Sequence, residues 1–414
     1  MVKGRTWRGL AGLVALTALL AAGCSSNDST ASHPAAPETP TPSTSTAAAQ
    51  MAAHGVEGPI GDVPWSQVGP GWMLAMWSPA VRVAPGESPP AGSPSPGTVP
   101  ETLYLVNPAG GRYAITTFPP PGDMSSPELV DWSGDGGHAL FYAEYAKPPT
   151  AIMVDLHTGA QTTLPVNGSL RFTRPDGKAL LLTIRSDNDR TSSLERVDLA
   201  GNKQLTYPTD KLAGKFTGGF IYTPDGTQLV LGTESGLALM GNDGTVGKAL
   251  PVADASCTPV RWWDDGAKTV LASCSADSQP QQLWLVPVDG TPPTALTAPI
   301  TDPSSHDTGD VNAWQLPAGT YVQYLGGCGA IHLGKLNADG TVSKVSVPNV
   351  VPGHSIYVIG AHGGNLDLQA MVAGCGPAQS LLDYDPAAGT STVLLGPPLN
   401  GGSVIKAIPY VGEQ

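Results

Sequence analysis

The sequence predicts an all-β fold, and three observations support this prediction. Short apolar runs recur along most of the chain. Each run is bounded by a turn in which Asp or Asn comes shortly before Gly, or in which two Gly residues are adjacent. The turns form two series of seven that alternate strictly, with a period of roughly 40–50 residues. Because such a period built from short strands is typical of one blade per repeat, we expect a seven-bladed β-propeller.

The two series of turns mark different places in each repeat. The first series precedes a β-rich run and has clear copies at residues 131–136, 172–177, 222–226 and 262–266, with weaker copies ending at Gly71, Gly319 and Gly364. The second series is expected to join the third strand of each blade to the fourth, at residues 107–110, 155–159, 198–201, 241–244, 288–290, 337–340 and 385–389. Asp or Asn before Gly suits the tight turns of hairpins. A β-sandwich is the alternative, since many short strands also suit that fold.

The N-terminus has the pattern of a bacterial lipoprotein signal peptide. Lys3, Arg5 and Arg8 precede an apolar run at residues 10–20, and Ala-Ala-Gly then leads into Cys24. The run is too short to span a bilayer. We expect cleavage before Cys24, with a diacylglyceryl group on its sulfur and a fatty acyl group on its amine as a stable membrane anchor. The alternative is an ordinary secretory signal with a chance Cys.

The chain after Cys24 is rich in Ser, Thr, Ala and Pro as far as residue 58. Such a segment cannot bury enough apolar surface to become ordered. We therefore expect a signal peptide at residues 1–23, a lipidated Cys and disordered tether at 24–58, and the propeller at 59–414. A second Pro- and Ser-rich segment, residues 84–100, interrupts the first blade as a surface insertion.

Two turns carry a resemblance to a known family. Residues 132–136 read Trp-Ser-Gly-Asp-Gly, and residues 223–226 read Thr-Pro-Asp-Gly. They resemble the Trp-Ser-Pro-Asp-Gly core of TolB-type and wider WD-repeat-like propellers, and the resemblance extends from about Gly71 onward. It implies the fold but says little about function. TolB itself is soluble and periplasmic, so its envelope partners are not carried over to a chain with a lipid-anchor signal.

Composition excludes some partners. The net charge is −13 and the pI is about 4.9, which argues against nucleic acid and against docking on anionic lipid headgroups. We expect a monomer that contacts the membrane through its lipid. Beyond the lipid on Cys24, no cofactor is indicated.

The four remaining cysteines suit two disulfides in an oxidising compartment. Cys257 and Cys274 lie symmetrically about the turn at 264–266, so an antiparallel hairpin would place them opposite each other. By elimination, Cys328 and Cys375 would link two adjacent blades. Metal binding is not indicated, because no CxxC spacing is present.

No catalytic motif is found: the sequence has no HExxH pair, no GxSxG elbow and no phosphate-binding loop. Asp131, Arg171 and Arg261 precede first turns, so they are candidates for binding a ligand in the central channel. Alternatively, the two arginines pair with acidic residues on the next blade, which is the interpretation we favour. His306, Asp307 and Asp310 lie in a polar segment, residues 301–312, that we interpret as a solvated loop rather than a metal or general-base site.

Tryptophans offer another possible ligand surface. Aromatic faces can stack on sugars, but packing between blades is the better explanation for most of them: Trp132, Trp262, Trp263, Trp284 and Trp314. Trp262 and Trp263 must point to opposite faces of their strand.

The last apolar stretch predicts how the ring closes. Blade one has a single strong strand before its insertion, at residues 72–77. We expect residues 404–408 to supply the strand that blade one lacks, with Pro409 ending the pairing because it has no N–H.

These observations favour an extracytoplasmic lipoprotein on the outer face of the bacterial cytoplasmic membrane, whose propeller binds an envelope protein, peptide or glycan. The alternative is a glycan-active hydrolase or lyase with its site at the mouth of the channel. His and carboxylates converging at one end of the channel would favour the enzyme.

Overall fold

The computed structural model describes residues 50–122, 126–185, 192–253, 255–276, 279–301, 307–372 and 376–410, except for the side chains of Asp307 and Cys328. The expected signal peptide and Cys24 lie outside these residues. Residues 48–414 form one compact unit. In the described part of the chain, no helix is both long enough and apolar enough to cross a membrane.

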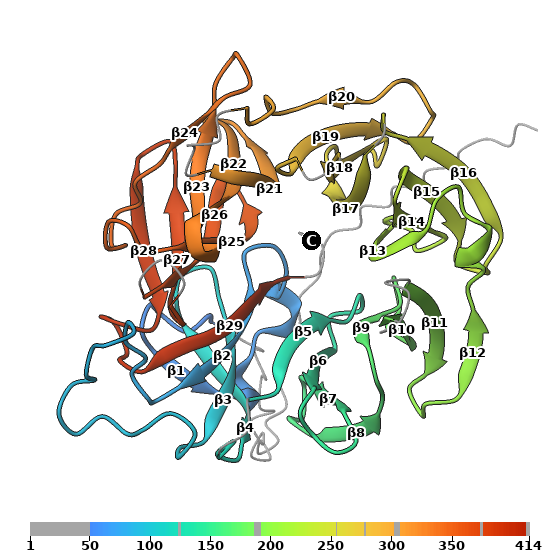
Figure 1. The fold of residues 1–414 in the computed structure, drawn as a ribbon. Coiled ribbons are helices and arrows are strands. Elements are labelled where there is room, and N and C mark those ends of the chain that lie inside the picture. Colours follow the sequence, from blue (N-terminus) through green and yellow to red (C-terminus); the bar gives the residue numbers. More distant parts are fainter. Residues whose placement is uncertain are drawn as a thin grey trace, which may run out of the picture. The chain divides into compact units, whose positions relative to one another are not determined.

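In the described residues, seven sheets arranged as the blades of a propeller account for nearly all the secondary structure, and they are antiparallel apart from the parallel pairing of β1 with β4 (Figure 1). Blades one and two contain β1 (Glu57–Pro59), β2 (Met73–Ser78), β3 (Glu101–Val106), β4 (Arg112–Phe118) and β29 (Ser403–Pro409), then β5 (Glu128–Trp132), β6 (His138–Ala143), β7 (Thr150–Asp155) and β8 (Gln161–Pro165). Blades three and four contain β9 (Ser169–Phe172), β10 (Ala179–Arg185), β11 (Ser192–Asp198) and β12 (Lys203–Thr206), then β13 (Phe216–Tyr222), β14 (Gln228–Thr233), β15 (Gly236–Gly241) and β16 (Val246–Pro251). Blades five and six contain β17 (Ser256–Trp262), β18 (Thr269–Ser275), β19 (Gln282–Pro287) and β20 (Thr294–Ala295), then β21 (Asp307–Leu316), β22 (Gly319–Gly326), β23 (Ile331–Leu336) and β24 (Val342–Lys344). Blade seven contains β25 (Ile356–His362), β26 (Asn365–Met371), β27 (Ala378–Asp385) and β28 (Thr390–Leu395). The predicted seven-bladed propeller is confirmed.

In the part of the chain that the structure describes, four short 3-10 helices lie between these strands. They are η1 (Ile60–Asp62), η2 (Trp65–Gln67), η3 (Thr209–Lys211) and η4 (Gly327–Gly329). Residues before the expected start of the propeller also contact it, since β1 pairs with β4 and the Ala52 N–H donates to the Tyr113 hydroxyl. The segment at 84–100 is a loop without strands between β2 and β3.

All seven predicted second turns join the third strand of a blade to the fourth in sequence order. Their glycines have φ between 67° and 89°, which a side chain would disfavour: Gly110, Gly159, Gly201, Gly244, Gly290, Gly340 and Gly389. In the first turn of blade five, the residue with a left-handed backbone conformation is Ala267, with φ of 49°, rather than Gly266.

The first turn of blade two shows why the repeated motif uses these residues. Trp132 is fully buried and donates its Nε1–H to the Gly136 carbonyl at 2.9 Å. The Ser133 hydroxyl donates to Asp135 at 2.5 Å, and the same carboxylate accepts the Gly137 N–H. Trp132 packs with Trp72, Tyr113 and other residues of blade one. The motif therefore fixes a turn and contributes to the core between two blades.

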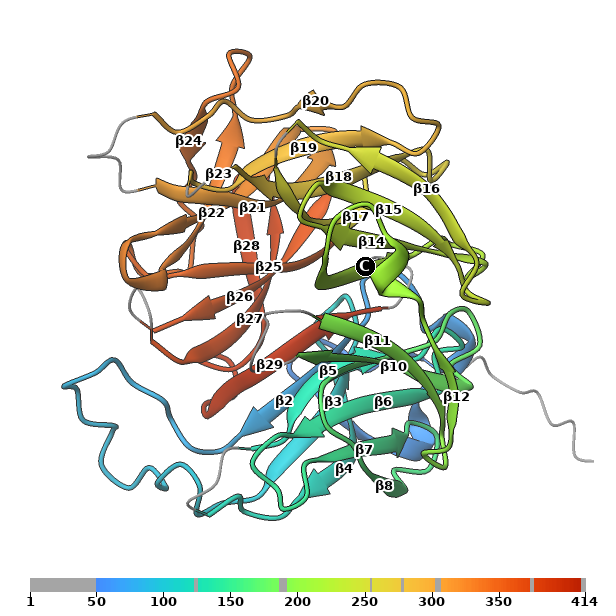
Figure 2. The ribbon, with the colours of Figure 1, turned by 45° about the vertical axis from the view of Figure 1, so that its right-hand side comes forward.

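The ring closes as predicted, because β29 pairs antiparallel with β2. Figures 1 and 2 show these strands, from opposite ends of the chain, side by side. The expectation that pairing ends at Pro409 was wrong by one residue. Met73 pairs with Pro409, and the Tyr410 N–H then donates to the Trp72 carbonyl at 2.8 Å. Since Pro409 lacks only its own N–H, it does not prevent the next residue from donating.

The predicted disulfide within blade five is present. Cys257 in β17 lies opposite Cys274 in β18, their Cα atoms are 4.1 Å apart, and their sulfurs are bonded. Both residues belong to a buried cluster. Cys375 and the Cys328 side chain lie outside the described part of the chain, so their pairing stays a prediction.

Candidate functional site in the central channel

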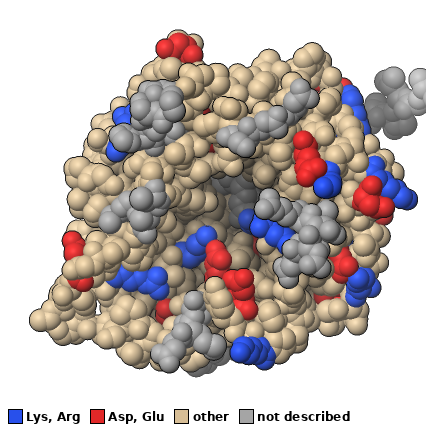
Figure 3. Space-filling view, viewed as in Figure 1, with Lys and Arg blue, Asp and Glu red and all other residues tan. Residues whose placement is uncertain are grey.

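The innermost strands of the seven blades surround a central channel. β5, β9, β13, β17, β21, β25 and β29 all contribute lining residues, and the enclosed volume is about 1250 Å³. Figure 3 shows the molecule hollowed near the centre of the ring, with Lys and Arg side chains close to the edge of the hollow. A concave space lined by apolar and a few charged groups is the usual place for a ligand.

The sequence suggested Asp131 as a residue of the channel wall, but the structure does not place it there. Its side chain is fully buried, and its carboxylate accepts the Phe172 N–H at 2.7 Å. The Arg174 guanidinium donates to both carboxylate oxygens, at 2.8 and 3.3 Å. A register shift in β5 between Leu129 and Asp131 accompanies this placement. Asp131 therefore joins blade two to blade three.

Arg171 and Arg261 do line the channel. The Arg171 side chain is 51% exposed, donates to the Val130 carbonyl at 3.0 Å and lies 3.8 Å from Asp131. Its acidic neighbour is thus on the preceding blade rather than the next one. The Arg261 guanidinium lies 5.5 Å from the centre of the Trp314 ring on blade six. A ligand in the channel could therefore contact both guanidinium groups.

Aromatic side chains line the same channel as these arginines. Tyr222, Trp262 and Trp314 line the channel, and Trp262 donates its Nε1–H to the Tyr222 carbonyl at 2.7 Å. Trp132, in contrast, is fully buried between blades, as predicted for most tryptophans. Trp262 and Trp263 pack into different hydrophobic clusters, as their alternation along a strand predicts.

The charges on the wall differ from those of the chain as a whole. Among the described lining residues, Arg171, Arg174, Arg261 and Lys406 are basic, whereas Glu128, Asp264 and Asp265 are acidic. Glu128 is paired with Lys406 at 3.1 Å, and Asp264 accepts the Lys268 N–H of its own turn. Because Arg174 pairs with the buried Asp131, the wall keeps Arg171 and Arg261 against Asp264 and Asp265, and it is close to neutral in a protein of net charge −13.

A second polar group lies on blade seven, where its His362 lines the channel, and it was not predicted from the sequence. His362, Asp367 and Asp383 each place one potential ligand atom within 4.8 Å of the others. His362 Nδ1 is 3.1 Å from Asp367 Oδ2, and His362 Nε2 is 4.0 Å from Asp383 Oδ1. His362 lines the channel, whereas the Asp367 side chain is fully buried.

Burial disfavours the charged forms of Asp367 and Asp383. Burial raises the pKa of Asp367, and its hydrogen bond with His362 and the charge of His362 lower that pKa by less. Burial also raises the pKa of Asp383, opposed by the charge of His362 and reinforced by that of Asp367. The available sequence signal was an Asp between Leu366 and Leu368, that is, a carboxylate inside an apolar strand.

The other polar candidate is only partly described. His306 lies outside the described residues. Asp307 and Asp310 belong to the strand β21 rather than to a loop, so the expectation of a polar loop at 301–312 was wrong at its C-terminal end. Asp310 is 2% exposed, so it is not a solvated loop residue.

Fold and site together define a seven-bladed β-propeller with a channel that a ligand can enter. No family model matches the chain, and no curated protein matches its sequence. Solved structures that match in fold include a prolyl endopeptidase at 11% identity and TM-score 0.49, covering 78% of this chain and 49% of that one, so this chain spans about half of that enzyme. Putative TolB from Agrobacterium tumefaciens matches at 14% identity and TM-score 0.39, covering 83% of this chain and 98% of that one. An oligogalacturonate lyase from Vibrio parahaemolyticus matches at 15% identity and TM-score 0.43, covering 65% and 78%. The seven sheets confirm the propeller fold that the turns implied, and the likeness to these structures extends to the fold alone.

Proposed function

We propose that this protein is a lipid-anchored binding module on the outer face of a bacterial cytoplasmic membrane. Its channel binds an acidic envelope ligand, either a glycan or a peptide that carries carboxylates. The N-terminal pattern ending at Cys24 supports the anchor. The channel supports the binding role.

The observation that carries this proposal is that Arg171 and Arg261 line the same channel as Tyr222, Trp262 and Trp314, with Arg261 over the Trp314 ring. A guanidinium pairs with a carboxylate through charge-assisted hydrogen bonds, and aromatic rings cover the apolar faces of sugars or side chains. The half-exposed Arg171 can form such a bond while it keeps its contact with Val130.

A thermal-shift panel tests the binding role. The probes are a galacturonate hexasaccharide, a Glu-rich peptide and the neutral cellohexaose. We expect at least one acidic probe to raise the melting temperature at low salt, because binding to the folded state stabilises it. The neutral sugar should have a smaller effect. If neither acidic probe shifts the melting temperature, the acidic-ligand proposal is rejected.

The anchor is tested separately. Full-length protein expressed in a bacterium should partition into detergent, and Cys24→Ser should abolish this partitioning. The control is Ser26→Ala, which leaves the predicted lipid acceptor intact. Wild-type protein that stays entirely in the aqueous phase would reject the anchor but not the binding role of the channel.

A second function, a glycan-active hydrolase or lyase, is favoured by the convergence of His362, which lines the channel, with the Asp367 and Asp383 carboxyl groups. Such groups can act as general acid and base. Turnover of polygalacturonate is measured from reducing ends and from the absorbance of unsaturated products. We expect Asp383→Asn to lose that turnover if this function holds. Absent turnover, or turnover that Asp383→Asn leaves unchanged, would reject it at this site.

A further inference from the structure

Blade seven presents two different faces to its neighbours. Leu366 and Leu368 of β26 pack in a cluster with Trp314 and Tyr321 of blade six. Gln369 instead points to blade one, where its amide donates to the Val404 carbonyl at 3.2 Å. Because side chains alternate along a strand, Asp367 lies on the same face as Gln369. Asp367 therefore belongs to the seam between blades seven and one, where the ring closes.

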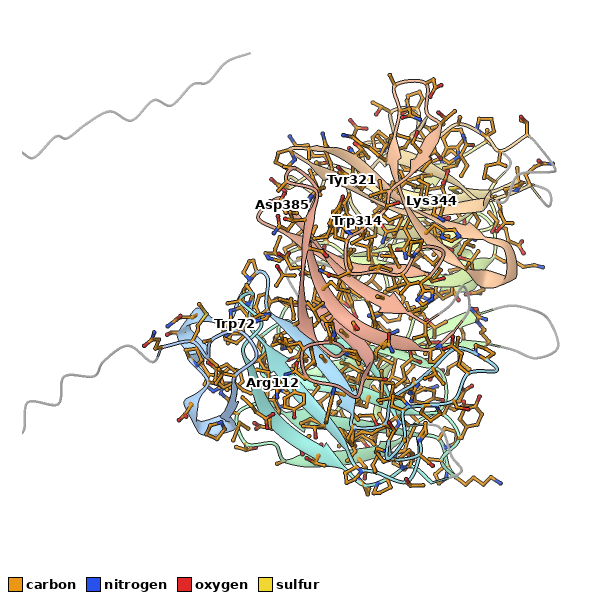
Figure 4. All side chains as sticks on the ribbon, turned by 90° about the vertical axis from the view of Figure 1, so that its left-hand side faces the viewer. Trp72, Arg112, Trp314, Tyr321, Lys344 and Asp385 are labelled. Atoms are coloured by element: carbon orange, nitrogen blue, oxygen red, sulfur yellow. A yellow bond between two sulfur atoms is a disulfide. The ribbon has the colours of Figure 1, made fainter. Side chains whose placement is uncertain are left out.

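Three strands bring their polar residues together at this seam. Asp367 in β26 pairs directly with Asp383 in β27, so the two carboxyl groups are cross-strand neighbours. His362 ends β25, and its ring packs against Gly71 of blade one, where an added Cβ would lie 2.8 Å from His362 Cδ2. Figure 4 shows this side of the molecule and labels Trp72 of blade one and Asp385 of blade seven. Asp385 is the last residue of β27, two residues after Asp383.

The two carboxylates are incompletely satisfied. Asp367 Oδ1 and Asp383 Oδ1 are both buried and have no hydrogen-bond partner. Their other oxygens interact with His362 and with the Asn365 amide, at 3.1 and 2.9 Å. A buried acceptor without a partner costs about 1–3 kcal/mol, and more when it is charged. An additional cationic ligand would satisfy both oxygens at once.

Charge balance at the seam also favours a bound cation. When both carboxyl groups are ionised, the group carries a charge of −2 beside a neutral imidazole and −1 beside a protonated one. Isolated buried charge is strongly disfavoured unless it is paired or coordinates a metal. A divalent cation would neutralise the pair.

We propose that His362, Asp367 and Asp383 bind a divalent transition-metal cation, preferentially Zn²⁺, at the seam between blades seven and one. Imidazole together with carboxylates suits Zn²⁺, whereas Ca²⁺ prefers six to eight oxygen ligands. Ligand atoms around tetrahedral Zn²⁺ lie roughly 3.4 Å apart. The three groups already lie within 4.8 Å of one another, so small side-chain rotations suffice.

Three protein ligands leave one position of a tetrahedral cation for water. The metal would hold three strands of blade seven together beside Gly71 and Pro409. Gly360 of β25 already approaches Pro409 closely, since an added Cβ would lie 2.7 Å from Pro409 Cβ. Metal binding should therefore stabilise the closed ring. This role does not depend on whether the channel binds an acidic ligand.

The test uses full-length protein after removal of metals with a chelator. Calorimetric titration with ZnCl₂ should give one site per chain, and the melting temperature should rise with Zn²⁺ but much less with Ca²⁺. Asp383→Asn and His362→Gln should each weaken Zn²⁺ binding at least tenfold. The matched controls Asp339→Asn and His354→Gln change the same residue types outside the cluster, and they should bind Zn²⁺ as the wild type does.

Asp367→Asn separates the metal from a simple ion pair. If the two carboxylates destabilise the protein when no cation is bound, the neutral amide should raise the melting temperature of the metal-free protein and abolish the further rise with Zn²⁺. If a protonated His362 merely bridges two carboxylates, the same variant should melt lower without metal. Absence of a single Zn²⁺ site, unchanged binding in Asp383→Asn, or a lower metal-free melting temperature in Asp367→Asn would overturn the proposal.

Discussion

Ala407 in β29 lies directly opposite Ala75 in β2, so the last strand of the chain completes the first blade. Both residues are buried, in a cluster that also contains Leu381 and Leu394 of blade seven. Lys406 in the same strand pairs with Glu128 of blade two. β29 therefore contacts its own blade and both neighbouring blades, and its loss would expose the edge of β2 and two interfaces.

Deleting the residues after Asn400 should lower the melting temperature sharply, because it removes β29 with its buried Val404 and Ala407 and uncovers the edge of β2. Differential scanning calorimetry and protease resistance measure the effect. The control deletes only residues 411–414 and leaves β29 whole. A protein truncated after Asn400 that melts like this control would contradict the closure mechanism.

Arg174→Ala should destabilise the protein by roughly 2–3 kcal/mol, because the fully buried Asp131 carboxylate loses a charged partner that bonds both of its oxygens. Arg171→Ala is the control. Its side chain is half-exposed and 3.8 Å from Asp131, so its loss should cost less than about 1 kcal/mol. Urea denaturation gives both values, and equal losses in the two variants would contradict the role assigned to Arg174.

Stability should fall in acid, because hydrogen bonds hold the turn aspartates ionised in the folded chain. The hydroxyl of Thr223 and the N–H of Thr227 lower the pKa of Asp225, and the hydroxyl and N–H of Thr341 lower that of Asp339. A carboxyl with a lowered folded pKa contributes stability that is complete above its unfolded pKa and is lost as the pH falls through the folded pKa.

Nine described aspartates have lowered pKa values, and each lies in a turn or at the end of the strand before one: Asp135, Asp155, Asp176, Asp198, Asp225, Asp243, Asp264, Asp289 and Asp339. Three acids have raised values and act in the opposite sense: Glu101, Asp367 and Asp383. We therefore expect the free energy of unfolding to drop below about pH 4. Urea titrations at neutral pH and in acid check this, and Asp225→Asn should show a shallower decline. Stability that does not change between these conditions would reject the explanation.

The turns, the ring closure and one disulfide could be predicted because each depends on local sequence or on simple symmetry. Gly244 and Gly340 follow Asp in tight turns, and Cys257 and Cys274 are equidistant from one hairpin turn. These features need no knowledge of how blades pack on each other.

Side-chain direction on the innermost strands could not be predicted in the same way. Register shifts occur in β5 between Leu129 and Asp131 and in β17 between Pro259 and Arg261. Each shift breaks the alternation on which a sequence-based assignment rests. The polar group on blade seven was not predicted for another reason. Asp367 and Asp383 are neighbours because the register between β26 and β27 pairs them, and their separation in the sequence does not reveal that register.

The central claim is that the channel arginines recognise an acidic ligand. It is tested most directly by calorimetric titration of whichever acidic probe raises the melting temperature into three proteins: wild type, the double variant Arg171→Ala/Arg261→Ala, and Arg185→Ala. Arg185 is exposed at the end of β10 and does not line the channel, so it controls for the loss of an arginine elsewhere on the surface. We predict that the double variant binds at least tenfold more weakly, as expected for the loss of charge-assisted hydrogen bonds, while Arg185→Ala binds like the wild type. Equal dissociation constants for the wild type and the double variant would contradict the account.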